Sequence, residues 1–309
     1  GNPINIMRDE VGAGTGYMDY FAGVATEMKG CTIPVSSDTL NMVIREPLGV
    51  VARIMSFNHP LFYMTAKTAA PLVAGNTVVF KPSDQTPLSA LRIAEIWHGL
   101  FPVGVFNLVT GGREAGRALA EHQRIAKVGL IGSVNAGRAV MRSAGETIKR
   151  LTLELGGKNA FIACADADPA KVATGVVRGM NFHSVAGQSC GSTSRIYLHE
   201  AIHDVALEHI IKGVSAIKVG LPTHPDTEMG CLSSKAQFDK VTSYIELARE
   251  EGAHIACGGG RPKSEKLARG YFIEPTVLAG VTDEMRVSRE EIFGPVVSIL
   301  KWRDEDELL

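Results

Sequence analysis

The chain has 309 residues, 45% of them hydrophobic, and its 32 basic and 33 acidic side chains leave a formal net charge of −1. This length accommodates two packed domains, and the balanced charge without a long Lys/Arg run argues against binding to nucleic acid or to a membrane surface. No segment reaches the roughly 20 apolar residues that span a bilayer, and the polar N-terminus, with Asp9 and Glu10, is unlike a secretory signal. We therefore expect a cytoplasmic, globular protein that acts on small molecules.

The cysteines are odd in number, and no two of them are spaced as CxxC. This pattern predicts neither a disulfide framework nor a zinc site, so no metal is expected. One of them, Cys190, lies in a motif of small residues. The others are expected to be small buried hydrophobic residues: Cys31, Cys164, Cys231 and Cys257.

In chain order, residues 30–47 come first, with two β-rich pieces around the polar turn SSDT, which predicts a protruding hairpin. From residue 47 onward, β-branched apolar runs alternate with helix-like stretches, the order typical of βαβ units and a parallel sheet. Four such units favour a doubly wound dinucleotide-binding domain. The predicted strands are 50–56, 77–81, 105–109 and 127–131, and the predicted helices are 61–73, 88–99, 114–120 and 136–143.

A second α/β series follows Glu154. It consists of a strand at 160–163, a helix at 169–180, a strand at 195–198 and long helices at 201–217 and 233–251. There are no internal repeats and no low-complexity linker. We therefore predict an α/β protein whose two domains meet near residues 150–157.

The segment LELGGK at 153–158 places Glu154 at the end of an apolar strand, before two glycines that allow a tight turn or close approach of a ligand. Glu154 is a candidate general base. The alternative is an ordinary strand end with a solvated carboxylate.

The segment GQSCGS at 187–192 places Cys190 among small residues, where a substrate can reach the sulfur. Its own backbone N–H could then face a developing oxyanion. The alternative is an inert, buried cysteine, which is the common case.

The segment IMSFNHP at 54–60 ends a strand with Asn58, just before a proline that starts a helix. An amide at the carboxyl edge of a parallel sheet can stabilise an oxyanion. The alternative is a helix cap, a role that asparagine often takes.

Two further strand ends carry groups suited to a dinucleotide. NTVVFKPSDQTP at 76–87 supplies Lys81 and Asp84, which could meet phosphate or ribose hydroxyls. GLIGSVNAG at 129–137 supplies Gly132 and Ser133 at a helix start, which suits a pyrophosphate. Turns and caps use the same residues, so each signal is weak by itself.

Taken together, order and spacing along the whole chain resemble the aldehyde dehydrogenase superfamily. The segments that carry the resemblance are PLGVVARIMSFNHPL at 47–61, AAPLVAGNTVVFKPSDQTPLSAL at 69–91, GLIGS at 129–133, LELGGK at 153–158, GQSC at 187–190 and EEIFGPVVSI at 290–299. The resemblance implies a doubly wound dinucleotide-binding domain at 1–29 and 48–153, an oligomerisation hairpin at 30–47 and a catalytic domain at 154–309.

The resemblance also implies an oxidation of an aldehyde to a carboxylic acid. Cys190 would attack the aldehyde, the Asn58 amide and the Cys190 N–H would hold the oxyanion, Glu154 would activate water to hydrolyse the thioester, and Lys67 would assist proton movement. This division of labour is chemically sound, because a thiolate both adds and leaves readily.

For the cofactor, the resemblance implies NAD, with NADP possible, since an acidic Asp84 should bond the ribose 2′-hydroxyl and repel a 2′-phosphate. The hairpin implies a homodimer or homotetramer. The cofactor-binding residues by correspondence are Phe57, Lys81, Asp84, Gly132, Ser133, Glu291 and Phe293. The residues expected to line the access tunnel are His59, Phe62, Tyr63, Ala66 and Ser184, and they select no particular aldehyde.

The chain departs from the family pattern in four positions and in extent. Family members usually run to about 480–500 residues, so both ends of this chain look cut, and we expect the 309-residue piece alone to be poorly soluble or inactive. The four positions are Phe57 where Trp is common, Ile131 where Thr is usual, Ala160 where Pro is frequent and Val185 where Asn is frequent.

Two alternatives remain. A CoA-acylating semialdehyde dehydrogenase would lack the hydrolytic glutamate, whereas Glu154 is present. A non-catalytic NAD-binding homologue or an inactive fragment would be expected to lose Cys190, Glu154 or Asn58, and all three are retained.

Overall fold

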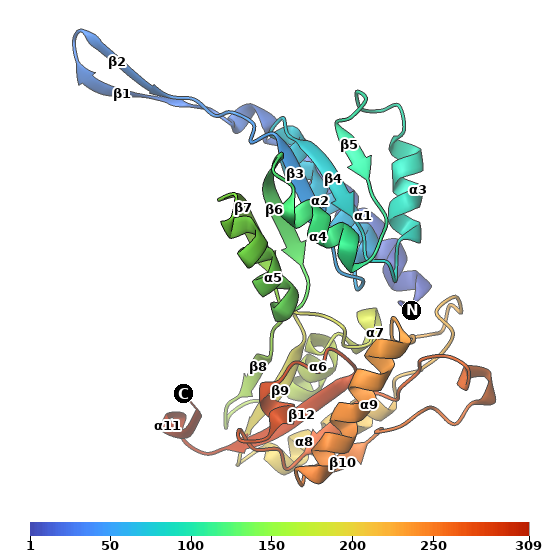
Figure 1. Cartoon of the computed structure of the whole chain (residues 1–309). Helices are drawn as coiled ribbons and strands as arrows, with labels where there is room; N and C mark the ends of the chain where they lie inside the picture. Colours follow the sequence, from blue (N-terminus) through green and yellow to red (C-terminus); the bar gives the residue numbers. More distant parts are fainter. Residues whose placement is uncertain (309) are drawn as a thin grey trace. The chain divides into compact units, whose positions relative to one another are not determined.

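The structure is a computed structural model that describes residues 1–308. The chain divides into two compact units (Figure 1). The N-terminal unit is Arg8–Leu155, and the C-terminal unit combines Gly1–Met7 with the chain from Gly156 onward. Of the helices in the described part of the chain, none is long and apolar enough to cross a membrane.

The sheet of the N-terminal unit is parallel, with strand order β5, β4, β3, β6, β7. The chain starts in the middle at β3, moves outward through β4 to β5, and returns to the other side with β6 and β7. This is the predicted doubly wound topology, and its reversal point lies between β3 and β6. The strands are β3 (Val50–Ile54), β4 (Thr77–Lys81), β5 (Phe106–Leu108), β6 (Ile125–Ile131) and β7 (Arg150–Glu154).

Helices cover both faces of this sheet. On one side α2 and α3 pack around a cluster that includes Met64, Val78 and Phe80, and on the other α4 and α5 pack around Val128 and Leu130. The two-sided burial explains why the central strands are mostly apolar. The helices are α1 (Ile4–Gly23), α2 (Pro60–Val73), α3 (Leu88–Trp97), α4 (Arg113–Glu121) and α5 (Val134–Gly145), with a short 3₁₀ turn, η1 (Ala25–Glu27).

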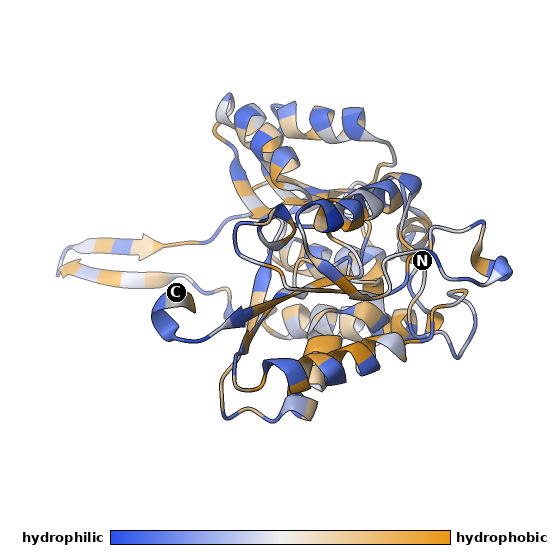
Figure 2. Ribbon diagram, turned by 90° about the horizontal axis from the view of Figure 1, so that it is seen from below, coloured by the Kyte–Doolittle hydropathy of each residue, from blue (hydrophilic) through white to orange (hydrophobic). Residues whose placement is uncertain are grey.

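The predicted hairpin is present as β1 (Cys31–Ser36) and β2 (Thr39–Val43), paired antiparallel from Cys31↔Val43 to Ser36↔Thr39. Every residue of both strands is exposed. Hydrophobic residues nevertheless occur along the hairpin (Figure 2), and Val35 and Leu40 are 62% and 71% exposed. The hairpin therefore contributes apolar surface that its own unit does not cover.

The sheet of the C-terminal unit has the order β10, β11, β12, β9, β8, with all pairs parallel except β10 with β11. The strands are β8 (Asn159–Ala163), β9 (Thr193–His199), β10 (His254–Cys257), β11 (Thr276–Ala279) and β12 (Val296–Trp302). The helices are α6 (Pro169–Gly179), α7 (Phe182–Val185), α8 (His203–Ser215), α9 (Lys235–Glu250), α10 (Arg286–Arg289) and α11 (Glu305–Leu308), with a 3₁₀ turn, η2 (Glu265–Leu267).

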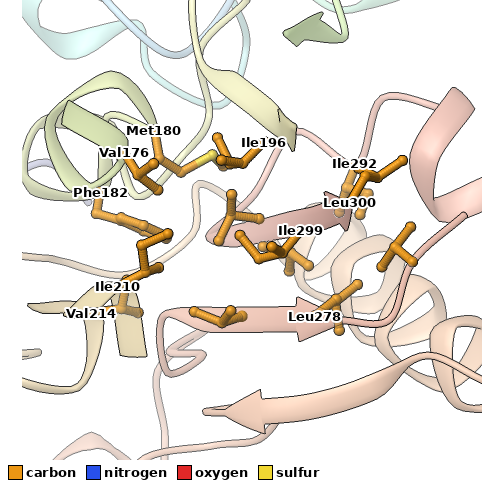
Figure 3. Packing of buried hydrophobic residues seen from close by; sticks show 14 of the residues in the cluster. Val176, Met180, Phe182, Ile196, Ile210, Val214, Leu278, Ile292, Ile299 and Leu300 are labelled. Carbon is orange, nitrogen blue, oxygen red and sulfur yellow. The ribbon is translucent and has the colours of Figure 1, made fainter. Parts of the chain in front are cut away.

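The core of this unit forms where α6 and α8 pack against the sheet. Val176, Ile210, Ile196 and Ile299 contribute fully buried side chains to one continuous cluster (Figure 3). Along β12 every residue but Lys301 is buried, as expected for a strand inside a sheet covered on both faces.

Most predicted elements are confirmed within a few residues. Helix α1 was not predicted from the sequence, because only Glu10 and Gly14 are buried in it and its apolar periodicity is weak. The expectation that the other four cysteines are buried is wrong: Cys31 and Cys164 are exposed, and Cys231 and Cys257 are partly exposed. Cys31 lies on the uncovered hairpin, where no core is available to bury it.

Candidate active site

The candidate residues of the N-terminal unit lie at or just beyond the carboxyl ends of its strands. Lys81 and Glu154 end β4 and β7, while Asn58 and Ser133 follow β3 and β6. Because the strands are parallel, these ends meet at one edge of the sheet. The fold thus gathers at that edge four side chains that are far apart in the sequence.

Asn58 lies in a buried turn between β3 and α2. It is 3% exposed, and the Tyr63 hydroxyl donates a hydrogen bond to its Oδ1 at 3.3 Å. The N-cap of α2 is His59, so Asn58 is not the helix cap that its sequence context left open. The preceding Phe57 is half-buried, and its carbonyl accepts a hydrogen bond from the Thr86 hydroxyl at 3.2 Å.

Glu154 lies close to Lys67 of α2. The Lys67 Nζ is 3.7 Å from Glu154 Oε1, and the two side chains are 37% and 53% exposed. The Gly132 N–H donates to the Glu154 carbonyl at 3.1 Å, which ties the β6 end to the β7 end. The carboxylate is therefore accessible to water and has a cation within reach, an arrangement that is compatible with proton transfer.

A cavity of about 550 Å³ lies within the N-terminal unit at the same edge. Ser133 caps α5 by accepting a hydrogen bond from the Ala136 N–H at 3.2 Å, so a helix N-terminus faces this region. A helix N-terminus with a nearby cation and an acid suits a dinucleotide, since it can meet both phosphate and ribose. The polar residues that line the cavity are Lys81, Ser83, Asp84, Arg113, Arg117, Glu121, Ser133, Asn135 and Ser143.

Lys81 is the buried cation of this cavity. It is 6% exposed, and its ammonium donates to the Pro82 carbonyl at 3.0 Å. Burial lowers the pKa of Lys81, and the nearby Asp84 acts in the opposite direction. The strand end thus holds a poorly solvated charge, which favours a polar or anionic ligand beside it.

In the C-terminal unit, Cys190 is exposed on a loop that is held by its neighbours. The Asn159 amide donates to the carbonyls of Cys190 at 2.6 Å and Ser192 at 3.1 Å. A Cβ at Gly157 would lie 2.8 Å from the Cys190 carbonyl oxygen, so only glycine fits there. The thiol is thus open to substrate while its backbone is fixed, contrary to the inert buried cysteine that the sequence left open.

Gln188 and Gly187 fix the other side of the same loop. Gln188 is 2% exposed, donates to the Val185 carbonyl at 2.9 Å and accepts from the Ser233 N–H at 3.1 Å. Gly187 has φ of +69°, and a Cβ there would collide with the carbonyl of Gly294. The GQSC motif therefore packs directly against the EEIFGP motif.

Glu291 meets the glycine turn of LELGGK. The Gly157 N–H donates to Glu291 Oε1 at 3.0 Å, and a Cβ at Gly156 would collide with the same carboxylate. Phe293 has a left-handed backbone with φ of +58°, and its carbonyl accepts a hydrogen bond from the Gln237 amide at 2.5 Å. The C-terminal unit thus brings Gly157, Cys190 and Glu291 together.

Lys158 is a buried cation that the sequence analysis did not single out, although it ends the LELGGK motif. Its ammonium is inaccessible and has no hydrogen-bond partner in the described part of the chain. Its pKa is lowered to about 8, chiefly by burial and also by the charge of Arg195, while Glu291 acts in the opposite direction. Keeping this ammonium charged in its buried position is therefore costly.

Two side-chain amides that anchor this site, Asn159 and Gln237, were not predicted from the sequence. Asn159 directly follows LELGGK, so its position next to a motif was a usable signal. Gln237 lies in α9, in a segment whose sequence resembles any exposed helix. Its role depends on a contact with Phe293, 56 residues along the chain, which no local pattern predicts.

The family model of the aldehyde dehydrogenase family matches residues 1–309. The chain belongs to the aldehyde dehydrogenase family. Among curated proteins it is 46% identical over 316 residues to Aldehyde dehydrogenase tropH of Talaromyces stipitatus, covering 100% of this chain and 61% of that protein. It is 43% identical over 294 residues to Betaine aldehyde dehydrogenase of Brucella ovis, covering 94% and 60%.

A solved aldehyde dehydrogenase from Bacillus cereus, in complex with NAD+, superposes with a TM-score of 0.95 at 40% identity and covers 100% of this chain and 62% of that chain. These matches confirm the resemblance and the fold class. The chain spans about three fifths of the length of the aldehyde dehydrogenases it matches.

Proposed function

We propose that the protein oxidises an aldehyde to a carboxylic acid with NAD+, using Cys190 as nucleophile and Glu154 as the base for water. The observation that carries this proposal is the Cys190 loop, in which an exposed thiol sits on a backbone fixed by Asn159 and Gly157. Membership of the aldehyde dehydrogenase family supports the reaction class.

In the first half of the reaction, the Cys190 thiolate adds to the aldehyde carbon and forms a thiohemiacetal oxyanion. The Asn58 amide and the Cys190 backbone N–H donate hydrogen bonds to that oxygen. Bound NAD+ supplies the acceptor for the aldehyde hydrogen and its electron pair. The carbon is left as a thioester on Cys190.

In the second half, Glu154 removes a proton from water, which adds to the thioester carbon. The C–S bond then breaks, releasing the acid and the Cys190 thiolate. Lys67 then assists the onward movement of the proton, a role that its 3.7 Å distance from the carboxylate supports. The presence of Glu154 as a base favours water over CoA as the acyl acceptor.

For the cofactor, we propose that the cavity of the N-terminal unit holds the adenosine and pyrophosphate parts of NAD. Asp84 is exposed there, where its charge would repel a 2′-phosphate and favour NAD over NADP. The residues proposed to contact the cofactor are Phe57, Lys81, Asp84, Gly132, Ser133, Glu291 and Phe293.

We also propose a cytoplasmic homo-oligomer. All five cysteines are unpaired, which fits a reducing compartment. The exposed apolar residues of the hairpin supply a surface for a second subunit.

The test follows NADH absorbance in the full-length protein, as its gene encodes it, with a panel of aldehydes, with NAD+ or NADP+, and with or without CoA. Cys190→Ala is expected to abolish turnover. Glu154→Gln is expected to stop after about one NADH per active site, because the thioester forms but is not hydrolysed. Cys164→Ala, which removes another exposed thiol of the same unit, is the control and should leave turnover intact.

Two results would contradict the proposal. Turnover that requires CoA would indicate an acyl-CoA product. Absence of NADH with every aldehyde, despite measurable NAD+ binding, would indicate a non-catalytic homologue.

A further inference from the structure

Asn58 makes a buried contact that the mechanism above does not use. The Tyr63 hydroxyl donates to Asn58 Oδ1 at 3.3 Å, and Tyr63 itself is only 6% exposed. A hydrogen bond donated to the oxygen distinguishes the two ends of the amide, so Nδ2 is directed away from Tyr63. The contact therefore selects one of the two amide orientations.

The Tyr63 ring is held in turn by its neighbours. The His59 ring meets it edge-on with centroids 5.7 Å apart, and the rest of the tyrosine lies in the cluster with Met55 and Phe80. Nδ1 of His59 is 2.5 Å from Oε1 of Glu10 in α1. A row of contacts thus runs from Glu10 through His59 and Tyr63 to Asn58.

Glu10 is unusual for a helix carboxylate because it is 8% exposed and its second oxygen has no partner in the described part of the chain. Burying a carboxylate this incompletely paired is costly. α1 packs closely on α2 one turn further along, where a Cβ at Gly14 would collide with the Thr65 hydroxyl. The close packing keeps Glu10 within reach of His59.

We propose that Tyr63 is a positioning residue for the Asn58 amide, held in place by His59 and Glu10. Its hydroxyl orients Nδ2 of Asn58 toward the oxyanion before substrate arrives, so that no reorientation is needed during the reaction. This inference rests on the oxyanion role proposed for Asn58. It assigns to Tyr63 a role beyond lining the access tunnel.

The test is the rate constant of the first NADH turnover, measured by stopped flow in the full-length protein. Tyr63→Phe keeps the ring and removes only the hydroxyl. We expect a rate about tenfold lower, the effect of about one lost hydrogen bond, with unchanged KM for the aldehyde and for NAD+. Tyr17→Phe is the matched control, because that tyrosine is 48% exposed and its ring packs on Phe62 rather than near Asn58.

The decisive comparison is a double-mutant cycle with Asn58→Ala. Alone, Asn58→Ala should slow the first turnover by about a hundredfold. If Tyr63 acts through Asn58, adding Tyr63→Phe to Asn58→Ala causes no further loss. An equal loss in both backgrounds would overturn the positioning role, because the hydroxyl would then act independently.

The cycle also separates this inference from the proposed function. A full rate in Asn58→Ala would remove the oxyanion role and the positioning role together. A slow Asn58→Ala protein with a fully active Tyr63→Phe protein would overturn only the positioning role.

The contribution of Glu10 is tested with a separate variant. Glu10→Gln keeps the size of the side chain but removes its charge, and it is expected to slow the first turnover about twofold to threefold. That loss should also vanish in the Asn58→Ala background. An unchanged rate in Glu10→Gln would show that Glu10 of α1 does not help to hold Tyr63 in place through His59.

Discussion

At the scale of single residues, two buried ammonium groups lie in the sequence motifs of this chain. Lys158 ends the LELGGK segment next to Glu291, and its pKa is lowered to about 8 chiefly because its ammonium is buried. Lys81 ends β4, and burial lowers its pKa as well. Lys158 lies beside the glycine turn of LELGGK, and Lys81 lies at a strand end.

The lowered pKa of Lys158 predicts that the free energy of unfolding depends on pH. Below pH 8 the ammonium is charged in both the folded and the unfolded chain, so the burial penalty is fully present. Between about pH 8 and 10.5 the folded protein releases this proton first, and the free energy of unfolding should rise by about 3 kcal/mol from this residue. Lys158→Met should therefore stabilise the protein at pH 7 and much less at pH 10, as measured by urea unfolding.

The control for this experiment is Lys235→Met, which removes an exposed ammonium paired with Asp239 on the surface of α9. Its effect should stay within about 0.5 kcal/mol at both pH values. If Lys158→Met stabilises the protein equally at pH 7 and pH 10, the stabilisation comes from the packing of the methionine side chain and not from the loss of a buried charge.

At the scale of elements, the thiol loop depends on backbone geometry more than on side chains. Gly187 adopts φ of +69° and lies against the carbonyl of Gly294, so the loop can approach the EEIFGP segment only without a Cβ. Gln188 and Asn159 then hold the loop through hydrogen bonds to main-chain groups.

Gly187→Ala should be destabilising because it adds both a left-handed strain and a collision with Gly294. We expect a loss of at least about 2 kcal/mol in the free energy of unfolding. Gly191→Ala, in the same loop, is the matched control, since its nearest neighbour, the Ser189 hydroxyl oxygen, is at an ordinary 3.6 Å. Equal thermal stability of the two variants would contradict this account of the loop.

At the scale of the whole molecule, the hairpin β1–β2 is the element that its own unit does not cover. Its strands carry exposed Ile33, Val35, Leu40 and Met42, whereas monomeric proteins rarely leave such a run open. A second subunit that covers this surface would remove it from water.

Leu40→Glu should therefore shift the full-length protein toward a smaller species in sedimentation velocity, because a charge would be buried in the subunit contact. Leu88→Glu is the control, since Leu88 is 78% exposed but lies on α3, outside the hairpin. An unchanged sedimentation coefficient for Leu40→Glu would argue against the hairpin as a contact between subunits.

The sequence by itself determined most of the local elements and named the candidates for the reactive groups. Alternating apolar runs predicted β3, β4 and β6 with their helices, because periodicity and turn residues are properties of short segments. Cys190, Glu154 and Asn58 stood out because each lies in a motif at a strand end or beside glycines. Family resemblance then ordered these motifs without any structure.

Only the tertiary structure decided the contacts that join distant segments. Gly157 forms a hydrogen bond with Glu291, which is 134 residues away in the sequence. Glu10 contacts His59, 49 residues away, and lies in α1, a helix that was not predicted from the sequence. The burial that lowers the pKa of Lys158 likewise depends on which elements pack around it. Such contacts follow from the packing of whole elements, which residue patterns constrain only loosely, because many pairings of the same helices and strands satisfy the same local signals.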